Sequence, residues 1–134
     1  MCGGAHRWGG AGQGSQCHVD ITADGGVVGK IGTQDIGTGT RTIMTQVAAE
    51  TLGLSMGQVK LAIGDNSLPP GGSSGGSTTV GGVSAATRKA GINALMKLYE
   101  VAAPARGVQP EALEAVDGQI RVKGTPSKSM TWVS

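Results

Sequence analysis

The stretch QDIGTGTRTIMTQVAAETLG, residues 34–53, decides the fold of this chain. Its second half predicts a helix, because apolar side chains recur there at helical spacing: Ile43, Met44, Val47, Ala48 and Leu52. Gly53 follows the last of them, at the position where a helix often ends on a left-handed residue. The first half reads as the end of a strand followed by a glycine turn. The stretch therefore predicts a strand, a turn and a helix in succession.

The turn before this helix has the composition of an anion-binding site. Gly37 and Gly39 flank Thr38, and Thr40 is placed to cap the helix. The first amides of a helix have no partner within it and carry partial positive charge, and glycines let a ligand approach them closely. An ordinary strand-to-helix turn has the same composition, so this turn alone does not identify a ligand.

A second glycine-rich loop strengthens the interpretation. The sequence GDNSLPPGGSSGGSTT, residues 64–79, leads into another long helix, and its two prolines exclude regular structure. Glycines and hydroxyls again stand at the start of the helix: Gly75, Gly76, Ser77 and Thr78. Two such helix starts in a short chain are expected by chance less often than one. We therefore predict that both loops contribute to one ligand site.

The remaining elements follow from alternation and turn residues. Strands are predicted at residues 16–22, 27–33, 58–63, 113–116 and 119–122, and the second helix from about Thr78 to Ala103. Asp24-Gly25 and Asp117-Gly118 supply the two hairpin turns, and Pro104 is expected to end the helix. The order ββαβαββ predicts an α+β fold, a two-layer sandwich with helices on one face of a sheet.

The second helix has an apolar face and three glycines. Its predicted face consists of Val80, Val83, Ala90, Ala94, Leu98 and Val101. Gly81, Gly82 and Gly91 each cost about 1 kcal/mol in a helix relative to alanine. We therefore expect the sheet or a ligand to approach this helix closely.

The two ends of the chain carry weaker patterns. Residues 1–15 are rich in glycine and are interpreted as a loop-like lead-in, so that residues 16–134 form a single domain. The tail from Gly124 to Ser134 is not expected to complete an element. Such an atypical beginning and end suggest a piece of a larger subunit.

Composition excludes several classes of function. The 134 residues carry a net charge of +2 without a basic run, and aromatic residues are scarce, so nucleic-acid binding is not indicated. No apolar run reaches the length of about 20 residues that a membrane span needs, and no secretory signal is apparent, so a cytoplasmic location is the default expectation.

The residue types of common catalytic sites also lack suitable partners. Cys2, Cys17, His6 and His18 show no metal-ligand spacing, and the two cysteines are expected to be unpaired thiols. Residues 71–75 match G-x-S-x-G, but no histidine follows His18, which excludes a serine hydrolase of that order. No catalytic or metal-binding residue is assigned.

Taken together, Gln34–Leu54, Gly64-Asp65, Pro69–Thr79 and the long helix resemble the molybdenum-binding large subunit of the xanthine dehydrogenase/aldehyde oxidase family. The bacterial aldehyde-oxidising branch is the most similar. The resemblance extends from about Gly9 to Trp132 and includes the segment GTPSKS, residues 124–129.

The resemblance implies a molybdopterin-binding subdomain and a set of cofactor-binding residues. These are Gly37, Thr38, Gly39 and Thr40 in the first loop and Gly75, Gly76, Ser77 and Thr78 in the second. Many relatives have glutamine where this chain has Thr38, which offers a hydroxyl in place of an amide. The second loop is expected near the molybdenum and the phosphates of the cofactor.

The resemblance also implies what lies outside this sequence. The general base of the family is a glutamate in a C-terminal segment that this chain does not reach, and the iron–sulfur and flavin centres lie on other domains or subunits. We therefore expect a fragment of a molybdenum hydroxylase that is inactive alone and does not retain its cofactor in isolation.

Two alternatives remain open. The chain could be a stand-alone, non-catalytic interaction module derived from that family, or a small anion-binding domain unrelated to molybdenum. Because a domain cut from its neighbours exposes apolar surface and sheet edges, we also expect a homo-oligomer. The two loops are expected to be mobile without a ligand.

Overall fold

The computed structural model describes residues 2–6 and 14–132. Its elements are β1 (Cys2–His6), β2 (Ser15–Ile21), β3 (Val27–Ile31), α1 (Thr40–Leu52), β4 (Val59–Ile63), α2 (Thr79–Arg106), β5 (Leu113–Val116), β6 (Gln119–Val122) and β7 (Thr125–Thr131). Single 3-10 turns, Met56–Gln58 and Pro110–Ala112, precede β4 and β5. The predicted order ββαβαββ is found, with one further strand at each end.

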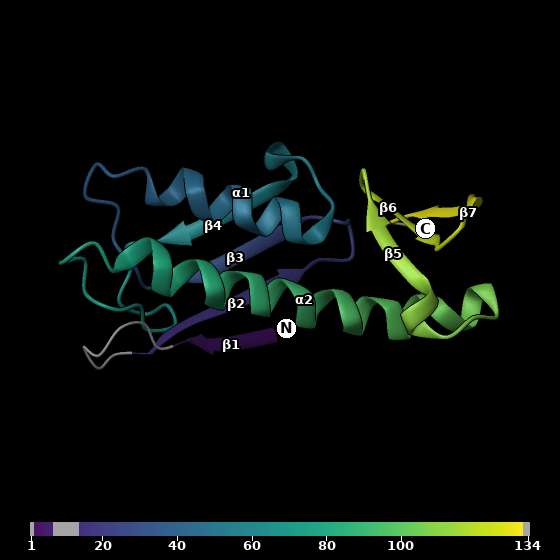
Figure 1. Ribbon diagram of the computed structural model, residues 1–134, viewed down its shortest axis with the longest axis horizontal. Helices are drawn as coiled ribbons and strands as arrows, with labels where there is room; N and C mark the ends of the chain where they lie inside the picture. Colours follow the sequence, from purple (N-terminus) through teal and green to yellow (C-terminus); the bar gives the residue numbers. More distant parts are fainter. Residues whose placement is uncertain (1, 7–13, 133–134) are drawn as a thin grey trace.

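The main sheet has four strands in the order β1-β2-β3-β4. β1, β2 and β3 pair antiparallel, whereas β3 and β4 pair parallel, from Val27 opposite Val59 to Ile31 opposite Ile63. α1 connects the two parallel strands. Both helices pack on this sheet and against each other, which gives the predicted α+β sandwich of two layers (Figure 1).

A smaller antiparallel sheet, β5-β6-β7, follows the far end of α2 (Figure 1). Val116 pairs with Gln119, so Asp117-Gly118 forms the predicted two-residue turn. The carbonyl of Gly53 accepts a 2.8 Å bond from the amide of Gly118, which joins this hairpin to the end of α1.

The strands at the two ends of the fold were not predicted. Cys2–His6, part of the expected lead-in loop, pairs with β2, and Thr125–Thr131, in the expected tail, pairs with β6. Neither segment shows clear alternation, because the first contains two successive glycines and the second is mostly polar. Backbone pairing along a sheet edge forms both strands instead. Residues 7–13 of the lead-in lie outside the described residues.

The core is aliphatic and rich in alanine on α2. The predicted face of α1 is confirmed, with Met44, Ala48 and Leu52 fully buried. On α2, Val83 and Ala90 are fully buried and Ala94 is 5% exposed, but Val80 is 37% and Val101 78% exposed, so these two assignments were wrong. Val80 lies in the first turn of α2 and lines the pocket between the two glycine-rich loops described below. Near the other end, Tyr99, Ala102 and Ala103 occupy the inner face in place of Val101.

The second helix is longer than predicted. Pro104 lies inside it, and the helix continues to Arg106 with Gly107 as its cap. The amide of Gly107 donates to the carbonyl of Pro104, and the amide of Val108 donates to the carbonyl of Ala103. Proline removes one helical hydrogen bond but does not prevent a last turn that is held by such a cap. A Cβ on Gly91 would lie 2.9 Å from Cγ2 of Thr51, so the close neighbour of this glycine is α1 rather than the sheet or a ligand.

Within the described residues, none of the helices combines the length and apolar character needed to cross a membrane.

Two helix-ending glycines offer a matched test of this packing. Gly53 and Gly107 both end helices with φ near +65°. A Cβ on Gly53 would lie 2.3 Å from the carbonyl oxygen of Ala115, whereas a Cβ on Gly107 would meet nothing within 4 Å. We expect Gly107→Ala to lower the free energy of unfolding by about 1 kcal/mol, the cost of a left-handed alanine.

Gly53→Ala should lower the free energy of unfolding by at least about 2 kcal/mol more than Gly107→Ala does, because its new methyl group also displaces β5. Urea unfolding of both variants measures the difference. Equal losses of stability would show that the C-terminal hairpin does not pack against the end of α1.

Candidate functional site

The two glycine-rich loops leave the main sheet at the same edge. β3 and β4 are parallel neighbours, and the loops follow their carboxyl ends and lead into α1 and α2 (Figure 1). The amide of Gly32 donates to the carbonyl of Pro69 at 2.7 Å, and the amide of Gly64 donates to the carbonyl of Thr33 at 2.8 Å. Ser74 Oγ donates to Gln34 Oε1 at 3.0 Å. These bonds join the loops that the sequence predicted to act together.

A surface pocket of about 420 Å³ lies where the loops meet. Its lining comes from both of them: Ile36, Thr38, Ser74, Gly75, Gly76, Ser77, Thr79 and Val80. Four of the predicted site residues are therefore brought together, namely Thr38, Gly75, Gly76 and Ser77. The other four, Gly37, Gly39, Thr40 and Thr78, do not line this pocket.

Two of these four residues have structural roles instead. Thr40 is fully buried, and its Oγ1 lies 3.1 Å from Oγ1 of Thr38. Thr78 Oγ1 donates to the carbonyl of Gly75 at 2.7 Å and so stabilises the turn before α2. The sequence did not assign Ile36, Ser74, Thr79 or Val80 to the site. Their only signal is that each is adjacent to, or two residues from, an assigned residue.

The start of α1 is capped by Asp35, not by Thr40 as predicted. Asp35 Oδ1 accepts bonds from the amides of Gly37 and Gly39 at 3.1 and 3.2 Å, and Oδ2 accepts one from the amide of Arg41 at 3.0 Å. These amides, first that of Arg41, lower the pKa of the Asp35 carboxyl below its ordinary value of 3.8. An aspartate two residues before a glycine is a known turn former, and this signal was overlooked.

The start of α2 is different. Within the described part of the chain, no acceptor bonds the amides of Thr79, Val80 or Gly81, and Thr79 and Val80 line the pocket. Residues 61–87 contain a single charged residue, Asp65. An anion here would be bound by backbone amides and hydroxyls, with the partial positive charge of the helix start.

The backbone beneath the pocket leaves room for a ligand. A Cβ added to Gly75 would meet nothing within 4 Å, and no left-handed backbone explains this glycine. The fold of the chain itself therefore does not require glycine at position 75. A ligand that approaches the backbone closely would require it.

A model of the molybdopterin cofactor-binding domain matches residues 2–134. The chain belongs to this family. It is 38% identical over 120 residues to the molybdenum-binding subunit of an Escherichia coli K12 aldehyde oxidoreductase, PaoC, covering 87% of this chain and 15% of that protein. It is 36% identical over 103 residues to a nicotinate dehydrogenase chain of Pseudomonas putida, covering 76% of this chain and 9% of that one.

Solved structures agree in fold. Quinoline 2-oxidoreductase from Pseudomonas putida 86 superposes with a TM-score of 0.82 at 22% identity, over 96% of this chain and 15% of that one. The Cu,Mo-CO dehydrogenase superposes with a TM-score of 0.77 at 29% identity, over 87% of this chain and 15% of that one. The resemblance to the molybdenum-binding large subunits of the xanthine dehydrogenase/aldehyde oxidase family is confirmed. This molybdopterin-binding domain spans about 15% of the length of such relatives.

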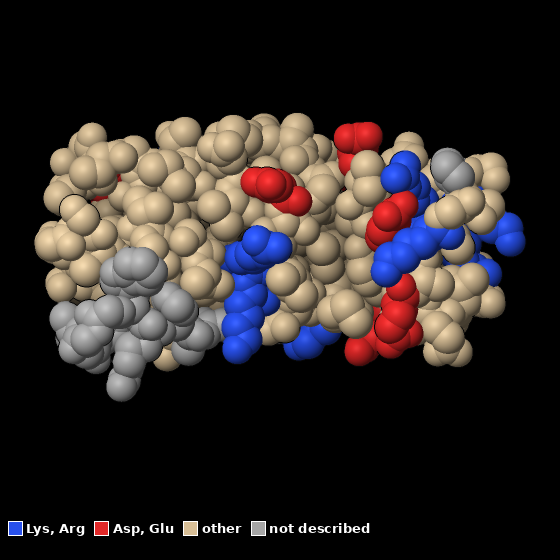
Figure 2. All heavy atoms as spheres, in the orientation of Figure 1, with Lys and Arg blue, Asp and Glu red and all other residues tan. Residues whose placement is uncertain are grey.

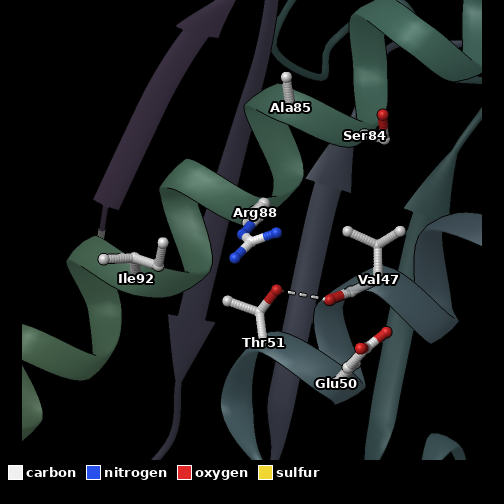
Figure 3. Close-up of a pocket in the computed structure, with 7 residues that line it drawn as sticks. All are labelled: Val47, Glu50, Thr51, Ser84, Ala85, Arg88 and Ile92. Carbon is white, nitrogen blue, oxygen red and sulfur yellow. Dashed lines mark hydrogen bonds between the residues drawn. The ribbon is translucent and has the colours of Figure 1, made fainter.

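The domain has a second groove, between α1 and α2, which offers no comparable chemistry. Its lining is Val47, Glu50, Thr51, Ser84, Ala85, Arg88 and Ile92 (Figure 3). Glu50 and Arg88 come from opposite helices, and the hydroxyl of Thr51 donates to the carbonyl of Val47 at 2.6 Å. The groove contains no histidine or cysteine, and the described residues hold no cluster of three metal-ligating side chains.

Cys17 is also unsuited to catalysis. It is buried and unpaired, and burial raises the pKa of its thiol to about 11. The thiolate, which is the reactive form, is therefore scarce at neutral pH. The pocket between the loops remains the candidate site of this domain.

The cap at the start of α1 predicts a pH dependence of stability. Because the pKa of Asp35 is lower in the folded chain than in the unfolded one, its stabilisation is complete above the unfolded pKa. This stabilisation is lost as the pH falls through the unfolded pKa of about 3.8 toward the lower pKa of Asp35 in the folded chain. We expect Asp35→Asn to reduce the free energy of unfolding more at pH 6 than at pH 3.

Urea unfolding of the wild-type chain and the variant at both pH values tests this expectation. A stability difference between the two proteins that is the same at pH 3 and pH 6 would contradict it.

Proposed function

We propose that this chain forms one wall of the molybdopterin site in a larger molybdenum hydroxylase subunit, with residues 16–134 as one subdomain of it. The pocket between the two loops is the observation that carries the proposal. Four residues that the family resemblance had marked for cofactor binding line it together. The relatives, which are several times longer than this chain, support a role within a larger subunit.

The residues of the pocket fit an anionic, hydrogen-bonding ligand. Thr38 and Ser77 offer hydroxyls, and the start of α2 offers amides without acceptors. Gly75 and Gly76 leave open space above the backbone. Phosphate and similar groups bind at helix starts of this kind. The role of this chain would be to hold and orient the cofactor, because none of its residues is assigned to catalysis.

The chemistry of the whole enzyme would come from elsewhere. The molybdenum cofactor, when bound, supplies the redox chemistry that the side chains described here lack. The names of the relatives suggest an aldehyde or a nitrogen heterocycle as substrate, and the family resemblance suggests other domains or subunits that carry iron–sulfur and flavin centres. We propose that this chain is inactive and free of cofactor in isolation, because it forms only part of the site.

Gly75 provides a direct test. In a molybdenum-binding subunit that carries these 134 residues in place of its own matching segment, we expect Gly75→Leu to lower the molybdopterin content at least about tenfold, because the side chain fills the space above the backbone. Fluorescence of the released, oxidised pterin and elemental analysis of molybdenum measure the content.

Gly57→Leu is the matched control. Gly57 also has open space around its missing side chain and no left-handed backbone, but it lies before β4, away from the pocket. Its variant should keep the cofactor. Full cofactor content in Gly75→Leu, or none in the unsubstituted hybrid, would reject the proposed function.

A second candidate is a non-catalytic module that self-associates. The outer face of α2 exposes Ile92 and Met96, at 44% and 38%. Figure 2 shows Lys and Arg mainly over the middle and one end of this view, and few charged residues among the described ones at the opposite end. Exposed apolar patches on small domains often mark a contact with another protein surface.

Sedimentation velocity at micromolar concentration tests this second candidate. We expect a homo-oligomer that dissociates in the double variant Ile92→Glu/Met96→Glu, since charge opposes burial of the face. Met56→Glu is the control, because Met56 is 43% exposed but belongs to the turn before β4. A monomer at all concentrations, or an oligomer that the double variant does not affect, would reject this candidate.

A further inference from the structure

β4 is an edge strand of the main sheet. Among the described residues its only strand partner is β3, with which it pairs in parallel. Successive residues of a strand direct their backbone groups to opposite edges. Gly64, which follows β4, donates its amide to the carbonyl of Thr33 on the β3 side at 2.8 Å. Leu61 and Ile63 lie an odd number of residues from Gly64, so their backbone groups face the free edge.

An arginine from the neighbouring helix covers part of this edge. α1 packs along β4 (Figure 1), and Nη1 of Arg41 donates to the carbonyl oxygen of Leu61 at 2.7 Å. Arg41 stands in the first turn of α1, where a cation interacts unfavourably with the partial positive charge of the helix start. Asp35 bonds its backbone amide, and neither ion pair of the described chain includes its side chain. The bond to Leu61 is therefore the contact that accounts for the position of this guanidinium.

The protection of the edge is confined to its centre. Exposed strand edges are templates for pairing with another chain, and proteins often protect them with charged side chains. Arg41 occupies one carbonyl, and the amide of Val59 donates to the carbonyl of Met56. The amide of Leu61 and the backbone groups of Ile63 have no strand partner in the described part of the chain. An incoming strand would thus have to displace one bond, that of Arg41.

The sequence of β4 suits antiparallel pairing with a second copy of itself. If two copies meet about a twofold axis at Leu61, the outward amide and carbonyl of this residue bond to those of its counterpart. Val59 then lies opposite the Ile63 of the second copy, which is a favourable β-branched pair. Lys60, which is exposed, lies opposite Ala62. Like charges therefore do not face each other across the pair.

We propose that the free edge of β4 is a pairing surface for a second copy of this chain and that Arg41 holds it closed. Each copy must release its own Leu61 carbonyl from Arg41 before the strands pair, so the guanidinium opposes pairing twice. A strand of five residues cannot by itself bury the roughly 1,000 Å² of a stable interface. The paired state is therefore weak, and its detection needs covalent capture.

The test captures the pair as a disulfide between two copies of the 134-residue chain. Lys60→Cys and Ala62→Cys are made in separate chains that also carry Cys2→Ser, and the two are mixed under mild oxidation. Cys17 is buried and stays unchanged. In the proposed register the thiols at 60 and 62 belong to a non-hydrogen-bonded pair, whose Cα atoms lie about 4.5 Å apart, within the range of a disulfide. Mass spectrometry of digested dimers measures the 60–62 link.

The link should be rare while Arg41 is present. In chains that also carry Arg41→Ala, it should be at least about tenfold more abundant, because a hydrogen bond from a charged donor no longer holds the edge. Arg41→Met, which keeps a long unbranched side chain without a donor, should give the same increase even if Arg41→Ala perturbs the helix start. Arg88→Ala is the matched control, because Arg88 is also an exposed helical arginine but lines the groove between α1 and α2. It should leave the link rare.

Three results would overturn the inference. The first is a 60–62 link that is as abundant with Arg41 as without it. The second is the lack of an increase in both Arg41 variants when circular dichroism shows that they are folded. The third is a set of 60–60 or 62–62 links at least as abundant as the 60–62 link, which would indicate another register or random collision. None of these results bears on the proposed function, because neither β4 nor Arg41 lines the pocket between the loops.

Discussion

The parallel pairing of β3 with β4 is the constraint on which the rest of the structure depends. Parallel neighbours end at the same edge of a sheet, so the loops that follow them leave the sheet side by side. Each loop leads into a helix, and both helices return along the same face of the sheet. The two helix starts therefore meet at one pocket, although about 40 residues separate them in the sequence.

Close backbone contact between the loops maintains this arrangement. A Cβ on Gly32 would lie 2.7 Å from the carbonyl oxygen of Pro69, and one on Gly71 would lie 2.9 Å from the amide nitrogen of Thr33. Larger residues at these positions would separate the loops. The glycines at 32 and 71 thus set the distance between the loops, whereas Gly75 leaves space for a ligand. The glycines of the two loops therefore differ in role, because those at 32 and 71 allow close backbone packing whereas Gly75 has open space around it.

The sequence predicted those parts of the fold that depend on side-chain periodicity or local turn chemistry. α1 and the Asp117-Gly118 hairpin are of this kind. It did not predict β1, since backbone pairing alone forms a strand that contains successive glycines. The last turn of α2 was missed because its cap at Gly107 outweighs the effect of Pro104. Asp35 was overlooked as the cap of α1, although an aspartate two residues before a glycine is a known turn former.

The central claim is that both loops belong to one cofactor site, and hydrogen exchange of a molybdenum-binding subunit that carries this segment tests it most directly. Exchange is compared between the cofactor-free and the cofactor-loaded forms by mass spectrometry of peptides. We expect slower exchange in the loaded form for peptides that cover residues 34–41 and for those that cover 73–81. Peptides over the groove between α1 and α2, residues 84–92, should not change. Protection confined to one of the two loops would contradict the account.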